Sequence, residues 1–265
     1  MSVTLLISAL NQNTDELIRK MKIDSDAVLV NQCENESVTE IESAGKKIKI
    51  IESTGRGVGA NRNLCIDNSF GDIVMFSDDD IVYYDNYAKV IAKEFEDHPE
   101  ADMIMFNVSV CEERRTYHNE GYKKLSALNI GRYPAYSIAV RRKVLTDKNL
   151  KFSLLFGGGA KYSNGEDSLF LREAYKKGVS MYATDKEIGE EIPRTSTWFE
   201  GYTEKFFFDR GVLFAFLYKK NSWIWRLRFV ITKKEMFQGA VTRKEANKLI
   251  NAGIKQGFKE MRGES

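Results

Sequence analysis

The stretch Ile73-Val74-Met75-Phe76-Ser77-Asp78-Asp79-Asp80 indicates the fold, because an apolar run passes directly into three acids. Residues 73–76 are apolar and include two β-branched side chains, which predicts a strand buried on both faces. Similar runs recur along the chain, at residues 3–7, 27–30, 48–51, 103–108 and 137–140. Helical patterns lie between the early runs, and this alternation predicts an α/β fold with a mostly parallel, mixed sheet flanked by helices.

Three helices can be placed around this sheet. Thr14 precedes apolar residues at helical spacing, which predicts a capped amphipathic helix over residues 14–21. Residues 61–66 follow a glycine cluster and predict a second helix, and residues 168–175 carry apolar side chains on one helical face. Ligands of such sheets bind beyond the carboxyl ends of the strands, so we expect the functional residues directly after strands.

The composition excludes several classes of protein. Of the 265 residues, 43% are hydrophobic, 12% are aromatic and only 3 are proline, which is typical of a folded globular chain. Cys33, Cys65 and Cys111 are widely spaced, so we expect neither a disulfide framework nor a zinc site. The apolar run at residues 3–7 follows no basic residues and is interpreted as a strand rather than a signal peptide. No run approaches the roughly 18 apolar residues of a membrane span, so we predict a cytoplasmic protein.

Charge is distributed unevenly along the chain. Residues 201–265 contain 14 Lys and Arg against 6 Asp and Glu, although the formal charge of the whole chain is only +2. Residues 1–200 are therefore acidic, which disfavours a nucleic-acid partner. We predict a catalytic domain over residues 1–200 and a helical, basic and aromatic C-terminal appendage over residues 201–265 that packs on it.

Residues 206–231 of this appendage mix aromatic and basic side chains. The mixture suits the headgroup layer of an anionic membrane, as in peripheral enzymes. A helical pair packed on the catalytic body explains the same pattern. We favour the first interpretation and predict weak contact of this segment with the inner face of the cell membrane.

The run Asp78-Asp79-Asp80 places three carboxylates side by side, and these repel one another. Such a run is tolerated where a divalent cation that also holds phosphate oxygens neutralises it. Hard oxygen ligands of this kind suit Mg²⁺ or Mn²⁺. The three aspartates are therefore candidate metal ligands beside a nucleoside diphosphate, and a solvated acidic turn or helix cap is the alternative.

The glycine cluster at residues 55–59 follows the apolar run at 48–51 and opens a helix. Glycines there allow backbone amides to approach an anion at the helix N-terminus. The pattern Gly55-x-Gly57-x-x-Ala60 also matches a dinucleotide fingerprint, with Asp78 near the separation expected for a ribose-binding acid. That fingerprint normally occupies the first strand-to-helix turn, whereas two predicted strands precede these glycines. A plain strand-to-helix turn is the third interpretation.

Two later segments carry candidate functional residues. Glu166 and Asp167 stand at the start of the helix predicted over residues 168–175, where the helix dipole favours an ionised carboxylate, so Asp167 is a candidate general base. A helix cap would need only one of these acids. Arg194 and Trp198 could close over a diphosphate or sugar, as a phosphate fork and a stacking platform, or could belong to an ordinary packed loop.

The order of these features resembles glycosyltransferase family 2, the inverting GT-A enzymes that use nucleotide-activated sugars, over roughly residues 1–200. The resemblance rests on the opening strand with Ser8-Ala9-Leu10-Asn11, the turn with Ala60-Asn61-Arg62-Asn63, the aspartate run and the Glu166-Asp167 pair. The segment 165–171 is especially similar to bacterial polysaccharide-assembly members. The resemblance implies a GT-A, Rossmann-like fold.

The resemblance also implies roles for individual residues. Asn11 and Gln32 would line the base pocket, and Arg62 would help to hold the nucleotide. Asp78 would contact the ribose, and Asp79 would bind the metal. Catalysis is assigned to Asp167 as the base, with Glu166 beside it, while Asp80, Arg194 and Trp198 complete the candidate site.

The implied reaction is a single displacement at the anomeric carbon of a nucleotide-diphosphate sugar, with UDP as the expected nucleotide. The acceptor would be a hydroxyl of a surface polysaccharide, as in a capsule or cell wall, or of a lipid-linked oligosaccharide. Two alternatives stay open from the residues. One is an NAD-dependent oxidoreductase that uses residues 55–60, and the other is a non-catalytic sugar-binding scaffold of the same fold.

Overall fold

The computed structural model describes residues 1–193, 201–237, 239 and 241–264. Its strands are β1 (Val3–Leu10), β2 (Asp26–Gln32), β3 (Ser37–Ser43), β4 (Lys46–Ser53), β5 (Ile73–Asp78), β6 (Ile81–Tyr83), β7 (Met103–Ser109), β8 (Lys123–Lys124), β9 (Ile138–Arg141) and β10 (Met181–Glu191). Its α-helices are α1 (Thr14–Lys20), α2 (Val58–Asp67), α3 (Tyr87–Asp97), α4 (Arg142–Asp147), α5 (Glu166–Lys176), α6 (Glu204–Tyr218), α7 (Ser222–Thr232) and α8 (Arg243–Arg262).

The ten strands that the structure describes form one mixed sheet, in the order β3-β4-β2-β1-β5-β9-β7-β10-β6, with β8 paired to β10. Strands β4, β2, β1 and β5 are parallel neighbours, as the alternation of strands and helices predicts. Strand β9 runs antiparallel between β5 and β7, which makes the sheet mixed. All six predicted strands are present, and the predicted fold class is confirmed.

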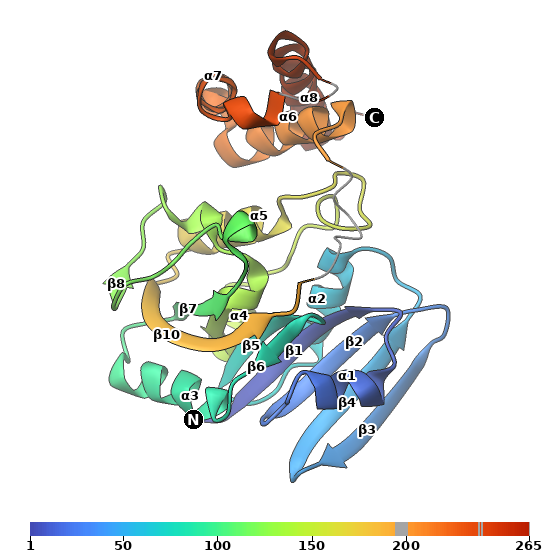
Figure 1. Cartoon of the computed structure of the whole chain (residues 1–265), viewed down its shortest axis with the longest axis vertical. Coiled ribbons are helices and arrows are strands. Elements are labelled where there is room, and N and C mark those ends of the chain that lie inside the picture. Colours follow the sequence, from blue (N-terminus) through green and yellow to red (C-terminus); the bar gives the residue numbers. More distant parts are fainter. Residues whose placement is uncertain (194–200, 238, 240, 265) are drawn as a thin grey trace.

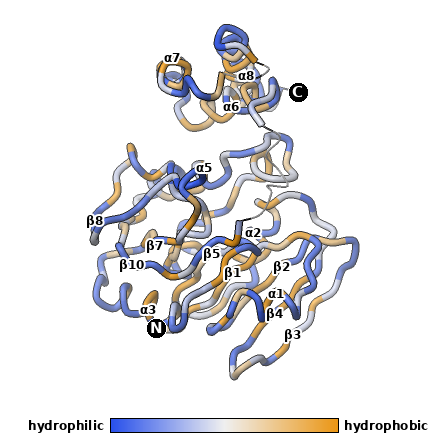
Figure 2. Tube along the Cα trace, viewed as in Figure 1, coloured by the Kyte–Doolittle hydropathy of each residue, from blue (hydrophilic) through white to orange (hydrophobic). Residues whose placement is uncertain are grey.

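Strand burial explains why the parallel strands could be predicted. Strands β1, β2 and β5 are buried almost throughout, and Figure 2 shows hydrophobic residues running along β1 and β2. Strand β3, an edge strand that forms an antiparallel hairpin with β4, is largely exposed and was not predicted. Strand β10 was also not predicted, since exposed charged residues at 185–187 interrupt its apolar pattern.

The helices begin close to the predicted positions, with local differences at their caps. The cap of α1 is Asn13, whose side chain accepts a hydrogen bond from the Glu16 amide at 3.1 Å, and not Thr14. Helix α2 begins at Val58, because Gly57 adopts a φ of 96° that only glycine tolerates well. Helix α5 begins directly at Glu166, so the two predicted acids occupy its first turn.

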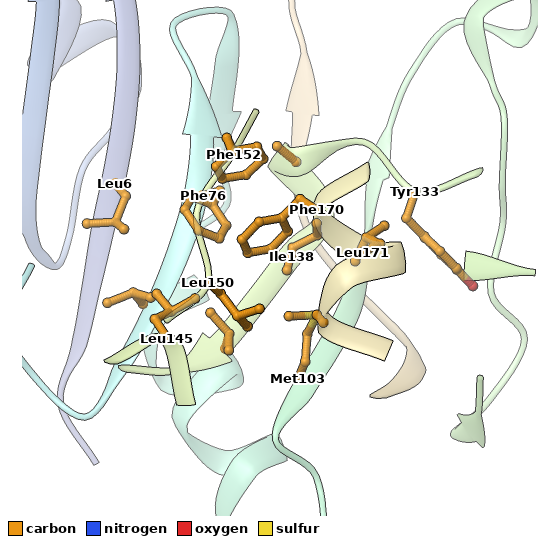
Figure 3. Packing of buried hydrophobic residues seen from close by; sticks show 14 of the residues in the cluster. Leu6, Phe76, Met103, Tyr133, Ile138, Leu145, Leu150, Phe152, Phe170 and Leu171 are labelled. Atoms are coloured by element: carbon orange, nitrogen blue, oxygen red, sulfur yellow. The ribbon is translucent and has the colours of Figure 1, made fainter. Parts of the chain in front are cut away.

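An aromatic trio holds α5 against the sheet. Figure 3 shows the rings of Phe76 from β5, Phe152 from the connecting loop and Phe170 from α5 packed together. Phe152 and Phe170 stack with centroids 4.2 Å apart, and Phe76 meets both rings edge-on at 5.2 and 5.6 Å. Such pairs contribute beyond simple burial. This packing brings the first turn of α5 to the carboxyl end of β5.

The C-terminal helices α6, α7 and α8 form a separate layer at one end of the molecule (Figure 1). Helices α6 and α8 cross closely, because Gly211 and Gly253 face each other. A Cβ added to Gly253 would lie 2.0 Å from the Phe208 carbonyl oxygen, so only glycine fits there. Val212 and Leu213 of α6 pack with Phe156 and Tyr162, which lie in the loop before α5. Among the described residues, no helix has the length and apolar character that a bilayer crossing demands.

Candidate functional site

A cavity of about 250 Å³ lies beyond the carboxyl ends of the parallel strands, where ligands of such sheets bind. Strand β1 contributes residues 8–10 to its lining, and β2 contributes Gln32. Residues 78–80, at the end of β5, form another wall. Asn61 and Arg62 of α2 and Glu166 of α5 also line the cavity.

The three aspartates are held at the turn between β5 and β6. Asp79 and Asp80 are largely buried, with 5% and 7% of their surface exposed. One carboxylate oxygen of Asp79, Oδ2, accepts a hydrogen bond from the backbone amide of Leu10 at 3.3 Å. The acidic run is therefore built into the wall of the cavity and is not the freely solvated turn that was the alternative interpretation.

A buried arginine joins residues from three elements. The guanidinium of Arg62 on α2 donates hydrogen bonds to Asp78 at 2.8 Å, Glu166 at 3.2 Å and Asp167 at 2.7 Å. Only 5% of the Arg62 side chain is exposed. The guanidinium also lies 5.2 Å from the centroid of the Phe152 ring, which fixes its position from a further side. Three acids around one arginine leave this site with an excess of negative charge.

Asp167 is held from two directions. Its Oδ1 accepts the hydrogen bond from Arg62, and its Oδ2 accepts one from the backbone amide of Ala135 at 3.1 Å. Burial raises the pKa of Asp167 to about 7, because the opposing attraction of Arg62 is partly offset by the negative charges of Glu166 and Asp78. At Arg62, burial lowers the pKa, but attraction to Asp167, Asp78 and Glu166 outweighs it and the pKa is raised. A carboxylate with this pKa can gain and lose a proton near neutral pH.

The glycine turn before α2 is bound by protein groups. The amide of Gly57 donates to the Gln32 side-chain oxygen at 3.1 Å, and the amide of Val58 donates to the Gly158 carbonyl at 2.9 Å. The prediction that these amides receive an anion is therefore not met at Gly57 and Val58. Gly59 is needed for close packing, since a Cβ there would lie 2.4 Å from the Ser153 carbonyl oxygen.

The structure brings together most of the predicted site residues. Gln32, Arg62, Asp78, Asp79, Asp80 and Glu166 line the cavity, whereas Asp167 is not part of the lining and is hydrogen-bonded to Arg62. Asn11 is exposed with a φ of 49° and is not part of the lining, whereas its neighbour Gln12 is. Arg194 and Trp198 lie outside the described residues.

Sequence reasoning missed three lining residues, Gln12, Arg114 and Glu191. Glu191 ends β10, and Arg114 donates to its carboxylate at 2.8 Å. Glu191 follows the rule that functional residues stand at strand ends, but its strand was not predicted. Arg114 belongs to a short turn whose pattern carries no signal, so only the folded chain places it.

The carboxylate oxygens that line the cavity can be compared with the ligands that a metal ion requires. Within the described part of the chain, no group of three or more His, Cys, Asp and Glu side chains converges closely enough to hold an ion alone. Asp78, Asp79, Asp80 and Glu191 nevertheless line one cavity with hard oxygen donors. Because Mg²⁺ is usually held by one or two carboxylates together with substrate phosphates and water, this set fits an ion that binds with a diphosphate.

Comparison with known families gives a match that covers more than half of the chain. The family model described as glycosyl transferase family 2 matches residues 7–155. That range contains the acidic run, Gln32 and Arg62, and it ends before Glu166 and Asp167. A search of curated proteins finds no match.

Solved structures share the fold at low sequence identity. The crystal structure of S. aureus TarS 1-349 in complex with UDP-GlcNAc is 14% identical, with a TM-score of 0.61 over 98% of this chain and 73% of that chain. The structure of S. aureus TarS 1-349 gives 15% identity and a TM-score of 0.59, over 99% and 73% of the two chains. A longer S. aureus TarS structure is 14% identical with a TM-score of 0.58, over 97% of this chain and 44% of that chain.

Proposed function

Since the chain belongs to glycosyl transferase family 2 and is a glycosyltransferase with a GT-A fold, we propose that it is a metal-dependent, inverting enzyme. Its donor is a nucleotide-diphosphate sugar, and UDP is the proposed nucleotide. One observation carries the proposal: Asp78 at the end of β5 and the two acids that begin α5 converge on Arg62, which lines the same cavity as Asp79 and Asp80. The S. aureus TarS complex with UDP-GlcNAc supports the choice of nucleotide by likeness of fold.

We assign the general base to Asp167. Its hydrogen bond to Arg62, which lines the cavity, and its raised pKa suit the removal of a proton from an acceptor hydroxyl. As that proton moves to Asp167, the hydroxyl oxygen bonds to the anomeric carbon and the bond to the diphosphate breaks, which inverts the configuration. Arg62 and the Ala135 amide orient the carboxylate, and Glu166 keeps the local charge negative so that Asp167 holds the proton.

We assign the metal to Asp79 and Asp80, and the ribose to Asp78, which is already bound to Arg62 on one oxygen. When bound, the ion supplies Lewis-acid stabilisation of the charge that develops on the diphosphate. Asp79 is held by the Leu10 amide, so its carboxylate is oriented before the donor arrives. We assign contact with the nucleobase of the donor to Gln32 and Gln12, which both line the cavity.

The proposed acceptor is a hydroxyl of a surface polysaccharide or of a lipid-linked oligosaccharide. Four apolar side chains of α7, Trp223, Ile224, Leu227 and Ile231, are 42% to 56% exposed and recur at helical spacing. Basic Lys219 and Lys220 precede this apolar face, a combination suited to an anionic membrane surface. We propose that α7 holds the enzyme at the inner face of the membrane, with residues 201–265 acting as an appendage of the catalytic domain.

The experiment that tests the function is a transfer assay on the full chain. A panel of sugar nucleotides is first screened for thermal stabilisation with and without Mn²⁺, since a ligand that binds only the folded state raises the unfolding temperature. The stabilising donor is then incubated with acceptors, and NMR reads the anomeric configuration of the product. We expect metal-dependent stabilisation and an inverted linkage. A retained configuration, or no consumption of any donor, would contradict the proposal.

A further inference from the structure

A second cavity, of about 330 Å³, lies between the first turn of α5 and helices α6 and α7. Four arginines line it: Arg132 from the preceding loop, Arg172 from α5, Arg210 from α6 and Arg228 from α7. No Asp or Glu belongs to its lining within the described residues. We call this cavity the arginine pocket.

Among the described residues, no Asp or Glu side chain neutralises Arg172 or Arg210. Neither Arg172 nor Arg210 forms an ion pair in the part of the chain that the structure describes, and the Nε atoms of both are buried without a hydrogen-bond partner there. Arg172 makes one long contact, from NH1 to the Ala127 carbonyl at 3.5 Å. Burial lowers the pKa of Arg210, and nearby Tyr218 and Tyr202 oppose this effect. Keeping buried cations without acids is costly unless an anion binds them.

Aromatic rings hold the arginine heads in place. The guanidinium of Arg210 lies 5.2 Å from the Phe206 ring centroid and 5.8 Å from that of Phe229. Arg228 lies 5.1 Å from the Trp225 ring, which stacks on Tyr218 with centroids 4.1 Å apart. Apolar walls of this kind reduce screening and strengthen attraction to an anion. The planar guanidinium fork matches phosphate oxygens well.

The arginine pocket is adjacent to the proposed catalytic base. Glu166 lines the first cavity and Ser168 lines the arginine pocket, so the first turn of α5, which also carries Asp167, borders both cavities. Ser168 donates a hydrogen bond to the Gly131 carbonyl at 3.1 Å, which closes the wall between α5 and the loop before Arg132. A group held in the arginine pocket would thus lie beside the acceptor side of the reaction.

We propose that the arginine pocket binds a phosphate group, as monoester or diester, carried by the acceptor. The inference rests on the proposed function, because it assigns the acceptor hydroxyl to Asp167. The acceptor that carries this phosphate can be lipid-linked, with its phosphate in the headgroup region at α7, or it can be soluble. In both cases the arginines recognise the same chemistry.

The test is calorimetric titration of the full chain with inorganic phosphate in metal-free buffer, where the acidic first cavity repels the probe. We expect saturable binding that Arg172→Gln and Arg228→Gln each weaken roughly tenfold to a hundredfold, the loss of one charge-assisted contact. Arg228 is exposed, so its variant should fold even if another does not. Arg243→Gln, an exposed arginine on α8, removes the same charge elsewhere and should leave binding unchanged.

Two results would overturn the proposal: no saturable phosphate binding by the wild type, or equal weakening by the Arg243→Gln control. Glucuronate bound as tightly as phosphate would overturn the assignment to phosphate. Because the titration contains no donor and no metal, it succeeds or fails independently of transfer. If sugar were transferred to a phosphate-free acceptor as fast as to a phosphorylated one, the role of the arginine pocket would be contradicted. The proposed function would not be affected by this result.

Vesicles separate the two sources of phosphate. Phosphatidylglycerol in phosphatidylcholine is compared with glycerol phosphate in solution, using wild type and Arg172→Gln. Weaker vesicle binding by the variant supports a lipid headgroup in the arginine pocket. Unchanged vesicle binding with weaker glycerol phosphate binding supports a soluble phosphorylated acceptor.

Discussion

The two arginine sites on either side of the first turn of α5 have opposite charge balances. At the first, Arg62 contacts three carboxylates. At the second, the arginine pocket, four arginines line a cavity without an acid among the described residues. This difference in charge indicates which kind of ligand each site can bind. By our proposals, the first site has surplus negative charge and takes a cation before it holds a diphosphate, whereas the second takes an anion directly.

The largest effect should come from removing the cation that we propose for the acidic site. We expect Asp79→Asn, or chelation of divalent ions, to lower turnover about a thousandfold or more, since Lewis-acid stabilisation amounts to several kcal/mol. Steady-state transfer with the identified donor measures this loss. Asp85→Asn, an exposed aspartate after β6, is the matched control. Full turnover with chelator present would show that the acidic site works without a cation.

Replacement of the proposed base, Asp167, should have a similar or smaller effect. Asp167→Asn removes the proton acceptor, and we expect turnover to fall roughly 10²–10⁴-fold. Donor binding should be retained, and the unfolding temperature should not fall, because two carboxylates still contact Arg62. Glu173→Gln changes an exposed acid of the same helix and should leave turnover unchanged. Asp167 would be excluded as the base by wild-type turnover in the Asn variant.

The two sites can also be compared by replacing one arginine in each and measuring the change in the free energy of unfolding. Arg62→Gln leaves three carboxylates without their cation, and we expect it to lower the free energy of unfolding by about 3–5 kcal/mol. Arg210→Gln removes a cation that has no acid partner in the described residues, so its loss should be smaller. Denaturant unfolding measures both.

Arg56→Gln is the control for Arg62, because Arg56 pairs with Glu34 at 2.8 Å on the surface. The loss of such a pair should cost at most about 1 kcal/mol. Equal losses for Arg62→Gln and Arg210→Gln would mean that the carboxylates around Arg62 contribute no special stability.

The smallest effect is a dependence on pH. The pKa of Asp167 is raised from its ordinary 3.8 to about 7, with Arg62, Glu166, Asp78 and the Ala135 amide facing it. The base must be ionised, so kcat/KM should fall up to about tenfold per pH unit below 7 and level off above it. A raised pKa in the folded state stabilises the fold at low pH, and this contribution should be lost as pH rises from about 4 to about 7.

Unfolding temperatures across that range, for wild type and Asp167→Asn, measure the contribution to stability. The variant should lack it, because its amide does not titrate. A wild-type rate profile that is flat between pH 5 and 8 would contradict the raised pKa.

The sequence predicted the buried part of the fold well. Parallel strands such as β1 and β5 are buried on both faces and therefore form continuous apolar runs. The family and the GT-A fold are also confirmed. The exposed edge strand β3 and the charged middle of β10 lack such runs, because solvent and not the core surrounds those residues. The division near residue 200 stays a prediction.

The candidate site was predicted in part, for a related reason. Asp78 and Asp79 follow a strand that the pattern reveals, whereas Glu191 ends a strand that it does not. The arginine pocket was not predicted, since its arginines come from a loop and three helices that meet only in the folded chain. A signal was present in α6, where Asp209 and Arg210 stand between the apolar residues 206–208 and 212–217. A charged side chain in a buried position needs a neutralising partner, and the folded structure shows which kind of partner it can bind.

The most direct test of the division between the two sites is one calorimetric experiment with two ligands and two variants. UDP with Mn²⁺ and inorganic phosphate in metal-free buffer are each titrated into wild type, Asp79→Asn and Arg228→Gln. We expect Asp79→Asn to lose UDP binding and keep phosphate binding, and Arg228→Gln to do the reverse. Loss of both ligands in either variant would contradict two separate sites of opposite charge.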